Sequence, residues 1–319
     1  MTLHRLTKAS LRGVWTALIT PFAVDGSVDT DALRALIREQ LVAGVTGLVP
    51  CGTTGETATL SLAEQDLVIT TTLDEVKGRV HVVAGAGAND TRTAVANHLR
   101  VGALCAGDYT VDGALHVTPW YNKPTQDGLF AHFMAVADSS ALPIILYNVP
   151  GRTGVDLLPE TVVRLVQADL ARDARRFVAI KEATGSVQRS QDLINALHAI
   201  GGQDLAILSG DDGHILSLLA IGGDGVISVT SHVCARELAL MVKAFDAGDL
   251  AAAQALSRKT SPLANHLFFR SNPIPVKTAL ALRGQAGGTI AARFRLPLCP
   301  LSDAETAELH KRLLQSGWV

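Results

Sequence analysis

The sequence lacks the features that mark several protein classes. No run of about 18 consecutive apolar residues occurs in its 319 residues, so we expect no membrane-spanning helix. The opening stretch, MTLHRLTKASLRG, has basic side chains but no long apolar segment or small-residue cleavage site, and we expect no secretory signal there. The cysteines, Cys51, Cys105, Cys234 and Cys299, lie far apart without the spacing of metal ligands. Because no export signal is expected, they are predicted to be free thiols of a cytoplasmic protein.

Charge and histidine spacing exclude two further classes. The formal net charge of −2 gives no basic surface, so we expect no nucleic-acid partner. The 10 histidines are scattered without the HExxH spacing of zinc enzymes, and we predict no metal. Hydrophobic residues make up 48% of the chain, which is enough to bury a large core.

What the sequence does contain is a repeat of short apolar runs. Each run precedes a segment with apolar residues at helical spacing, and one unit takes roughly 30 residues, the size of a strand–helix repeat. The runs begin at Val14, Thr46, Val80, Gly113, Pro143, Phe177, Leu205 and Gly225. Helix N-caps are expected at Asp29, Ser61, Asp90, Thr125 and Ser186.

These repeats predict an α/β fold in which the strands close into a (β/α)8 TIM barrel. We assign residues 1–12 to a short, poorly ordered N-terminal extension and residues 13–247 to the catalytic barrel. Residues 248–319 show no strand signal and are predicted to form a C-terminal helical domain of three helices. An open, doubly wound sheet is the alternative, but no GxGxxG motif follows the first strand and uninterrupted parallel repeats favour closure.

Polar residues mark the ends of the predicted strands, where the active site of such a barrel lies. They are Thr20, Thr53, Thr54, Tyr121, Tyr147, Lys181 and the segment Ser209–Asp212. Taken singly, each has an ordinary structural explanation, such as a solvated strand end, an ion pair or a turn. Their convergence on one rim favours a functional site. The glycines of GTTGE also allow successive backbone N–H groups to cradle a carboxylate.

Lys181 ends the apolar run FVAIK, where a charged group is costly to bury. Because side chains alternate along a strand, Ala179 and Ala183 should share the face of an inward-pointing Lys181. The residues expected to face the helices are Val178, Ile180 and Glu182. Burial disfavours the charged form of a lysine, and a neutral amine can form a Schiff base with a carbonyl compound. We therefore predict Lys181 as the nucleophile.

Seven motifs occur in order along the chain: GTTGETATL, VTPWYNKPTQDGL, ILYNVPGRTG, IKEATG, LSGDD, GVISVTSHV and NPIPVK. With them the sequence resembles the 4-hydroxy-tetrahydrodipicolinate synthase (dihydrodipicolinate synthase) family, from about Val14 into the last helices. That family belongs to the pyruvate-dependent class I aldolases, which include N-acetylneuraminate lyase. Arg152 in YNVPGRTG is the most telling residue, because the sialic acid lyases typically lack it.

The resemblance implies a pyruvate site. Lys181 would form the Schiff base with the keto carbon of pyruvate. The backbone N–H groups of Thr53 and Thr54, with the Thr54 hydroxyl, would hold the pyruvate carboxylate. Backbone groups of Gly210 and Ile227 would line the same site.

The resemblance also implies residues for the protons and the second substrate. Tyr147, Thr53 and Tyr121 would form a hydroxyl relay, since such groups both accept and donate protons. Tyr121 would come from the neighbouring subunit of a tight dimer. Arg152 would hold the carboxylate of L-aspartate 4-semialdehyde.

The implied activity is the condensation of pyruvate with this semialdehyde, giving 4-hydroxy-tetrahydrodipicolinate in lysine and diaminopimelate biosynthesis. It needs no metal or organic cofactor, and a homotetramer built as a dimer of dimers is expected in the cytoplasm. One alternative is another pyruvate-dependent aldolase or a 2-keto-3-deoxy sugar acid dehydratase. The other is a non-catalytic paralogue that binds a keto acid. The presence of both Arg152 and Tyr121 argues against the first alternative. The complete set of Thr53, Tyr121, Tyr147, Arg152 and Lys181 argues against the second.

The chain departs from the resemblance where many family members bind L-lysine as an inhibitor. The candidate regulatory pocket here comprises Thr57, Ala58, Asn89 and Trp120, with Leu62, Gln65 and Thr93 at other positions of the pattern. Thr93 stands where a glutamate is typical, and Leu62 offers no hydrogen bond. Because a desolvated amino acid needs charged or polar partners, weak inhibition is expected. Simple packing of Trp120 in the interface is the structural alternative.

Overall fold

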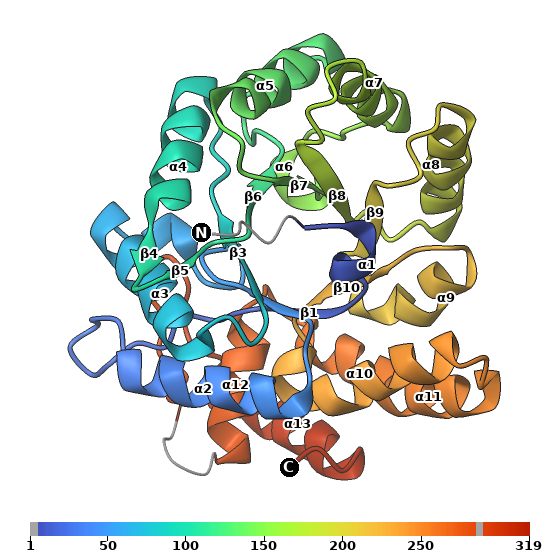
Figure 1. The fold of residues 1–319 in the computed structure, drawn as a ribbon. Helices are drawn as coiled ribbons and strands as arrows, with labels where there is room; N and C mark the ends of the chain where they lie inside the picture. Colours follow the sequence, from blue (N-terminus) through green and yellow to red (C-terminus); the bar gives the residue numbers. More distant parts are fainter. Residues whose placement is uncertain (1–5, 285–289) are drawn as a thin grey trace. The chain divides into compact units, whose positions relative to one another are not determined.

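The computed structural model describes residues 6–284 and 290–319. Eight strands form a closed barrel with the neighbour order β1–β10–β9–β8–β7–β6–β3–β2 (Figure 1). They are β1 (Gly13–Ala17), β2 (Gly47–Val49), β3 (His81–Gly85), β6 (Gly113–Val117), β7 (Ile144–Asn148), β8 (Phe177–Glu182), β9 (Ala206–Ser209) and β10 (Gly225–Ser228). Each overlaps one of the predicted apolar runs, so the predicted (β/α)8 barrel is confirmed.

The described chain divides into two compact units. The first comprises residues 6–13 and 81–227, and the second comprises residues 14–80, 228–284 and 290–319. The division into a barrel over residues 13–247 and a helical domain over residues 248–319 stays a prediction. No helix in the described part of the chain is long and apolar enough to cross a membrane.

The core of the first unit lies between its strands and the helices that follow them. The helices are α1 (Lys8–Leu11), α4 (Thr91–Ala103), α5 (Gln126–Ser139), α6 (Pro150–Thr153), α7 (Pro159–Leu170), α8 (Val187–Ala199), the 3₁₀ turn η2 (Asp212–His214) and α9 (Ile215–Ala220). Phe133 of α5, Leu165 of α7 and Leu193 of α8 are buried in one cluster with Ile180 of β8. Truncating such a side chain to alanine typically costs about 2–5 kcal/mol, so this cluster fixes the helix-facing side of the sheet.

Two features of the first unit differ from the sequence prediction. Residues 6–12 are not poorly ordered, because Thr7 caps α1 and both Leu6 and Leu11 are buried. Residues 1–5 of the predicted extension lie outside the described residues. A short antiparallel hairpin of β4 (Cys105–Ala106) and β5 (Tyr109–Thr110) was not predicted, since two-residue strands leave no alternating pattern.

The five predicted helix N-caps are confirmed. Asp29, Ser61, Asp90, Thr125 and Ser186 each precede a helix, and each side-chain oxygen accepts a hydrogen bond from the backbone N–H three residues ahead. Each bond satisfies one of the N–H groups that a helix leaves unpaired at its start.

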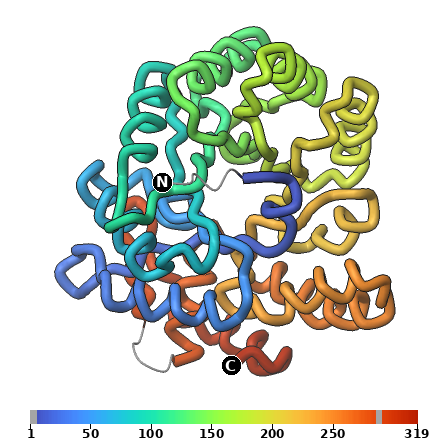
Figure 2. The backbone as a smooth tube through the Cα atoms, in the orientation of Figure 1, coloured from blue at the N-terminus to red at the C-terminus, as the bar shows by residue number. Residues whose placement is uncertain are grey.

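The second unit contains β1, β2 and seven helical segments. These are α2 (Thr30–Ala43), the 3₁₀ turn η1 (Thr57–Thr59), α3 (Leu62–Val76), α10 (Ser231–Asp246), α11 (Leu250–Leu267), α12 (Ile274–Arg283) and α13 (Asp303–Gln315). The last three confirm the helices predicted after residue 248, and they can be followed in orange and red in Figure 2.

A buried ion pair ties α12 to the loop after β2. Lys277 Nζ lies 2.6 Å from Glu56 Oε1, and the side chains of both residues are fully buried. The same nitrogen donates to the carbonyl of Thr20 at 3.0 Å. Burial lowers the pKa of Lys277, and the Glu56 carboxylate opposes that shift. A lone charge here would be very costly, so each partner requires the other.

Three buried histidines meet in the first unit, a feature that their scattered positions in the sequence did not reveal. His98 Nδ1 of α4 lies 3.1 Å from His116 Nε2 of β6, and His132 Nδ1 of α5 lies 3.0 Å from Thr91 Oγ1. The other ring nitrogen of each histidine has no partner in the described structure. Burial lowers the pKa of His98 to about 4, and it also lowers the pKa values of His116 and His132.

This cluster predicts a loss of stability in mild acid. The unfolded chain takes up a proton near the ordinary histidine pKa of 6.5, whereas folded His98 resists protonation down to about 4. The contribution of His98 is therefore fully present above about pH 6.5 and falls by about 2 kcal/mol on lowering the pH from about 7.5 to about 5. Denaturant unfolding of His98→Gln should show a smaller loss over that range. The exposed-site control His310→Gln should keep the wild-type slope, and equal slopes in both variants would contradict the prediction.

Candidate functional site

The register between β7 and β8 brings together two predicted site residues. Tyr147 pairs with Lys181 in this parallel ladder. Each residue is only 6% exposed, and Lys181 Nζ lies 4.4 Å from the centroid of the Tyr147 ring. Among the described residues, Lys181 has no carboxylate partner. A buried amine against a phenol ring, with no anion to pair it, is suited to nucleophilic chemistry.

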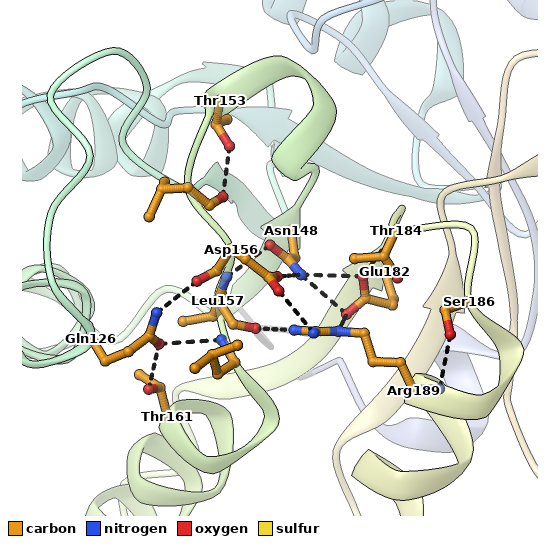
Figure 3. A network of polar contacts seen from close by, with 12 residues as sticks. Gln126, Asn148, Thr153, Asp156, Leu157, Thr161, Glu182, Thr184, Ser186 and Arg189 are labelled. Carbon is orange, nitrogen blue, oxygen red and sulfur yellow. Dashed lines mark hydrogen bonds and ion pairs between the residues drawn. The ribbon is translucent and has the colours of Figure 1, made fainter.

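The orientation of Lys181 follows from its neighbours on β8. Ile180 packs in the helix-side core, and the Glu182 carboxylate receives a hydrogen bond from Arg189 of α8 at 3.2 Å (Figure 3). Lys181 therefore points to the opposite, barrel-facing side, as predicted. The alternation does not extend to Val178, because the β7–β8 register shifts there and Phe177 packs in the helix-side core instead.

Glu182 is a buried carboxylate directly after the predicted nucleophile. Burial raises the pKa of Glu182, while the Arg189 guanidinium and hydrogen bonds from Asn148 and Thr184 act against that rise. These partners hold the strand end at which Lys181 stands. Sequence reasoning placed Glu182 toward the helices but did not identify the groups that bind it.

Gly210 leaves the space that the Lys181 side chain occupies. The backbone N–H of Gly210, just after β9, donates to the carbonyl of Glu182 at 2.7 Å. A Cβ atom at position 210 would lie 3.1 Å from Lys181 Cε and 2.5 Å from Ala183 Cβ. Ile227 of β10 is also buried in the described structure. Only a glycine at position 210 allows this close approach.

The short helix α6 carries Arg152 and anchors the loop of Tyr121. Arg152 is exposed in the single turn of α6, which is separated from β7 by Val149 alone. The backbone N–H of Tyr121 donates to the carbonyl of Thr153 at 3.2 Å. Tyr121 has a positive φ of 77° and is 87% exposed. Holding a tyrosine in this conformation costs on the order of 1–3 kcal/mol, which the contacts of the surrounding loop must offset.

The predicted carboxylate-binding loop lies in the second unit. Thr53 is half-buried and Thr54 is buried, within a turn in which the Glu56 N–H donates to the Thr53 carbonyl at 3.1 Å. Thr54 Oγ1 accepts a hydrogen bond from Asn272 Nδ2 at 2.9 Å. The NPIPVK motif contains Asn272, but nothing in the sequence indicates that this side chain binds Thr54.

The candidate regulatory residues fall in both units. Thr57 and Ala58 belong to η1 in the second unit. In the first unit, Asn122 Nδ2 donates to the Asn89 carbonyl at 2.8 Å, and Trp120 is 39% exposed. No cluster of three or more His, Cys, Asp or Glu residues that could hold a metal occurs in residues 6–284 or 290–319.

A buried lysine at the carboxyl end of a barrel strand is the arrangement expected of a Schiff-base-forming lyase. A family model described as the dihydrodipicolinate synthetase family matches residues 10–316. The chain is also 47% identical over 305 residues to the 4-hydroxy-tetrahydrodipicolinate synthase of Nitratidesulfovibrio vulgaris strain DP4, covering 96% of this chain and 98% of that protein.

Solved structures agree with this match. The dihydrodipicolinate synthase of Thermotoga maritima is 38% identical with a TM-score of 0.88, covering 97% of this chain and 99% of that one. The chloride-inhibited enzyme of Acinetobacter baumannii, solved in complex with pyruvate, is 40% identical with a TM-score of 0.87, covering 97% and 100%. The chain belongs to the dihydrodipicolinate synthetase family. The predicted lyase activity, synthesis of 4-hydroxy-tetrahydrodipicolinate, is thereby confirmed.

The close approach at Gly210 predicts a specific effect of one added methyl group. In Gly210→Ala, the new Cβ should displace Lys181 Cε, because Ala183 on the other side cannot yield without moving the backbone. Misplacing the amine should slow borohydride trapping of pyruvate by about 10-fold or more. The control is Gly151→Ala, where a Cβ meets nothing within 4 Å. Trapping at the wild-type rate in Gly210→Ala would show that the contact does not position Lys181.

Proposed function

We propose that Lys181 carries the condensation of pyruvate with L-aspartate 4-semialdehyde through a Schiff base. The observation that carries this proposal is the buried Lys181 amine, held 4.4 Å from the Tyr147 ring centroid without a carboxylate partner. Lys277, the other buried lysine in the described residues, is engaged by Glu56 and a carbonyl. Among the described buried lysines, Lys181 is therefore the one whose amine is not engaged by a carboxylate.

The reaction begins with attack of Lys181 Nζ on the keto carbon of pyruvate. Loss of water gives a protonated imine, which acts as an electron sink. A proton leaves the methyl carbon, an enamine forms, and its carbon attacks the aldehyde of the semialdehyde. The new alkoxide takes a proton, and the amine of the bound product then attacks the imine carbon. This last step closes the ring and releases Lys181.

Each substrate carboxylate has a proposed partner. The backbone N–H groups of Thr53 and Thr54 and the Thr54 hydroxyl bind the pyruvate carboxylate. Arg152 binds the carboxylate of the semialdehyde, because a guanidinium forms a two-pronged, charge-assisted contact with it. Backbone groups of Gly210 and Ile227 line the pyruvate site.

Tyr147 moves protons at the Schiff base, with Thr53 and Tyr121 completing the relay. We further propose that Tyr121 acts in the site of a neighbouring subunit. Its backbone is hydrogen-bonded to Thr153 while the residue is 87% exposed, so its side chain is accessible to a neighbouring subunit. A dimer of dimers in the cytoplasm is the assembly we propose. The reaction as written uses no metal or organic cofactor.

Lys181→Ala should retain the fold and lose almost all turnover. The substitution removes the only atom that forms the covalent intermediate, so the rate should fall on the order of 10³-fold or more. The assay uses pyruvate with L-aspartate 4-semialdehyde, and compares N-acetylneuraminate and keto-deoxy sugar acids as alternative substrates. Lys311→Ala, at an exposed site, is the control. If the unmodified enzyme turned over a sugar acid but not the semialdehyde, the proposed function would be overturned.

L-lysine should inhibit this enzyme weakly or not at all at millimolar concentration. The candidate pocket comprises Thr57, Ala58, Asn89 and Trp120. Near it in the family pattern, Thr93 lacks the charge of the typical glutamate and Leu62 offers no hydrogen bond to a desolvated ligand. The measurement is the initial rate against added L-lysine at a fixed, subsaturating pyruvate concentration. Strong inhibition at low concentration that disappears in Asn89→Ala would contradict this expectation.

A further inference from the structure

The residues directly after Tyr147 and Lys181 belong to one polar network (Figure 3). Asn148 ends β7, Glu182 ends β8, and the two are paired in the strand register. Asn148 Nδ2 lies 3.2 Å from one oxygen of Glu182 and 3.3 Å from the other. Both residues are buried, at 0% and 5% exposure. The network therefore starts from the same strand ends that place the nucleophile and its tyrosine.

Arg189 of α8 extends the network with three donors. Its Nε donates to Glu182 Oε2 at 3.2 Å, its Nη1 donates to Asp156 Oδ2 at 2.9 Å, and its Nη2 donates to the carbonyl of Leu157. These three acceptors match the planar fork of a guanidinium. A lysine keeps the charge but cannot reproduce that geometry.

The segment of Asp156 and Leu157 is thus held from two sides. Asn148 Nδ2 donates to Asp156 Oδ1 at 2.8 Å, and the Leu157 N–H donates to Asn148 Oδ1 at 3.0 Å. From a third direction, Gln126 Nε2 of α5 donates to the Asp156 carbonyl at 2.7 Å. Figure 3 shows these bonds converging on one short stretch of backbone between α6 and α7.

Helix α6 lies in the chain between two segments that the network holds in place. Its first anchor is Asn148, and its second is Asp156 with Leu157. Between them, Thr153 Oγ1 donates to the Val155 carbonyl at 2.9 Å, and the Thr153 carbonyl accepts from the Tyr121 N–H. The network therefore fixes the backbone that carries Arg152 and the loop that presents Tyr121.

We propose that Asn148, Asp156, Glu182 and Arg189 are positioning residues that set Arg152 and Tyr121 relative to the Lys181–Tyr147 pair. This inference rests on the proposed function, because it assigns the network to the second substrate and the relay. Glu182 and Asp156 share the Arg189 guanidinium, and replacing a buried ion pair such as Glu182–Arg189 by apolar residues is often neutral or stabilising. Their directional bonds instead hold Arg152 and Tyr121 in one geometry relative to Lys181 and Tyr147. The attack of the enamine on the semialdehyde requires that geometry.

The test uses Arg189→Lys, which keeps the positive charge beside Glu182 but removes the fork. Borohydride trapping of pyruvate should stay near the wild-type rate. The kcat/KM for the semialdehyde should fall by about 10- to 100-fold, as small misplacements of a substrate do. Arg152→Ala is the reference for this pattern. The matched control is Arg172→Lys, since Arg172 pairs with Asp138 in an exposed ion pair.

A second variant protects the test against misfolding. Asp156→Asn removes a carboxylate whose side chain is 35% exposed and leaves the Glu182–Arg189 pair in place. It should give a selective loss of the same kind, and the double variant should lose no more than Arg189→Lys alone, because the Arg189–Asp156 contact is already disrupted there. Unfolding temperatures are measured for every variant.

Equal loss of trapping and of semialdehyde turnover in both variants would reduce the network to general support and overturn the inference. If the kcat/KM for the semialdehyde in Arg189→Lys and Asp156→Asn matched that of the Arg172→Lys control, the inference would also be overturned. Absence of trapping or turnover in the unmodified enzyme is a separate outcome, which would overturn the proposed function and this inference with it.

Discussion

The parallel ladder between β7 and β8 governs the geometry of the candidate site. Its register sets Tyr147 beside Lys181 and Asn148 beside Glu182. A slip of one residue would turn Lys181 toward the helices and Ile180 into the barrel. Packing against α5, α7 and α8 opposes that slip, because it buries Ile180 completely. The burial of Ile180 in the core therefore also keeps the Lys181 amine facing the Tyr147 ring.

The two buried lysines show how burial can serve structure or chemistry. In the second unit, Lys277 is compensated by Glu56, and its loss would leave a buried carboxylate without the cation that pairs with it. In the first unit, Lys181 contacts the face of the Tyr147 ring, while the nearby carboxylate of Glu182 is turned away to Arg189. Alternation along β8 keeps that carboxylate off the amine. Adjacent residues of β8 therefore have different roles: Glu182 stabilises the strand end through Arg189, and Lys181 stays unpaired by a carboxylate in the described structure.

The sequence was sufficient to predict the parts of the molecule that rest on local patterns. The eight strands, the N-caps such as Ser186 and the placement of Lys181 at a strand end all follow from periodicity and spacing. It could not predict the hairpin at Tyr109, whose strands are too short to alternate. Nor could it predict the bonds of Arg189, because its partners come from segments that only the fold brings together. The cluster of His98, His116 and His132 could not be predicted either, because its members also come from separate segments.

The identity of the trapped lysine tests the account most directly. The full-length enzyme is incubated with pyruvate, reduced with borohydride, digested and analysed by mass spectrometry. We predict the added mass on the peptide containing Lys181 and on no other. A label on Lys277 or on the exposed Lys123 would contradict it, because the geometry of β7 and β8 would then not be that of the nucleophile.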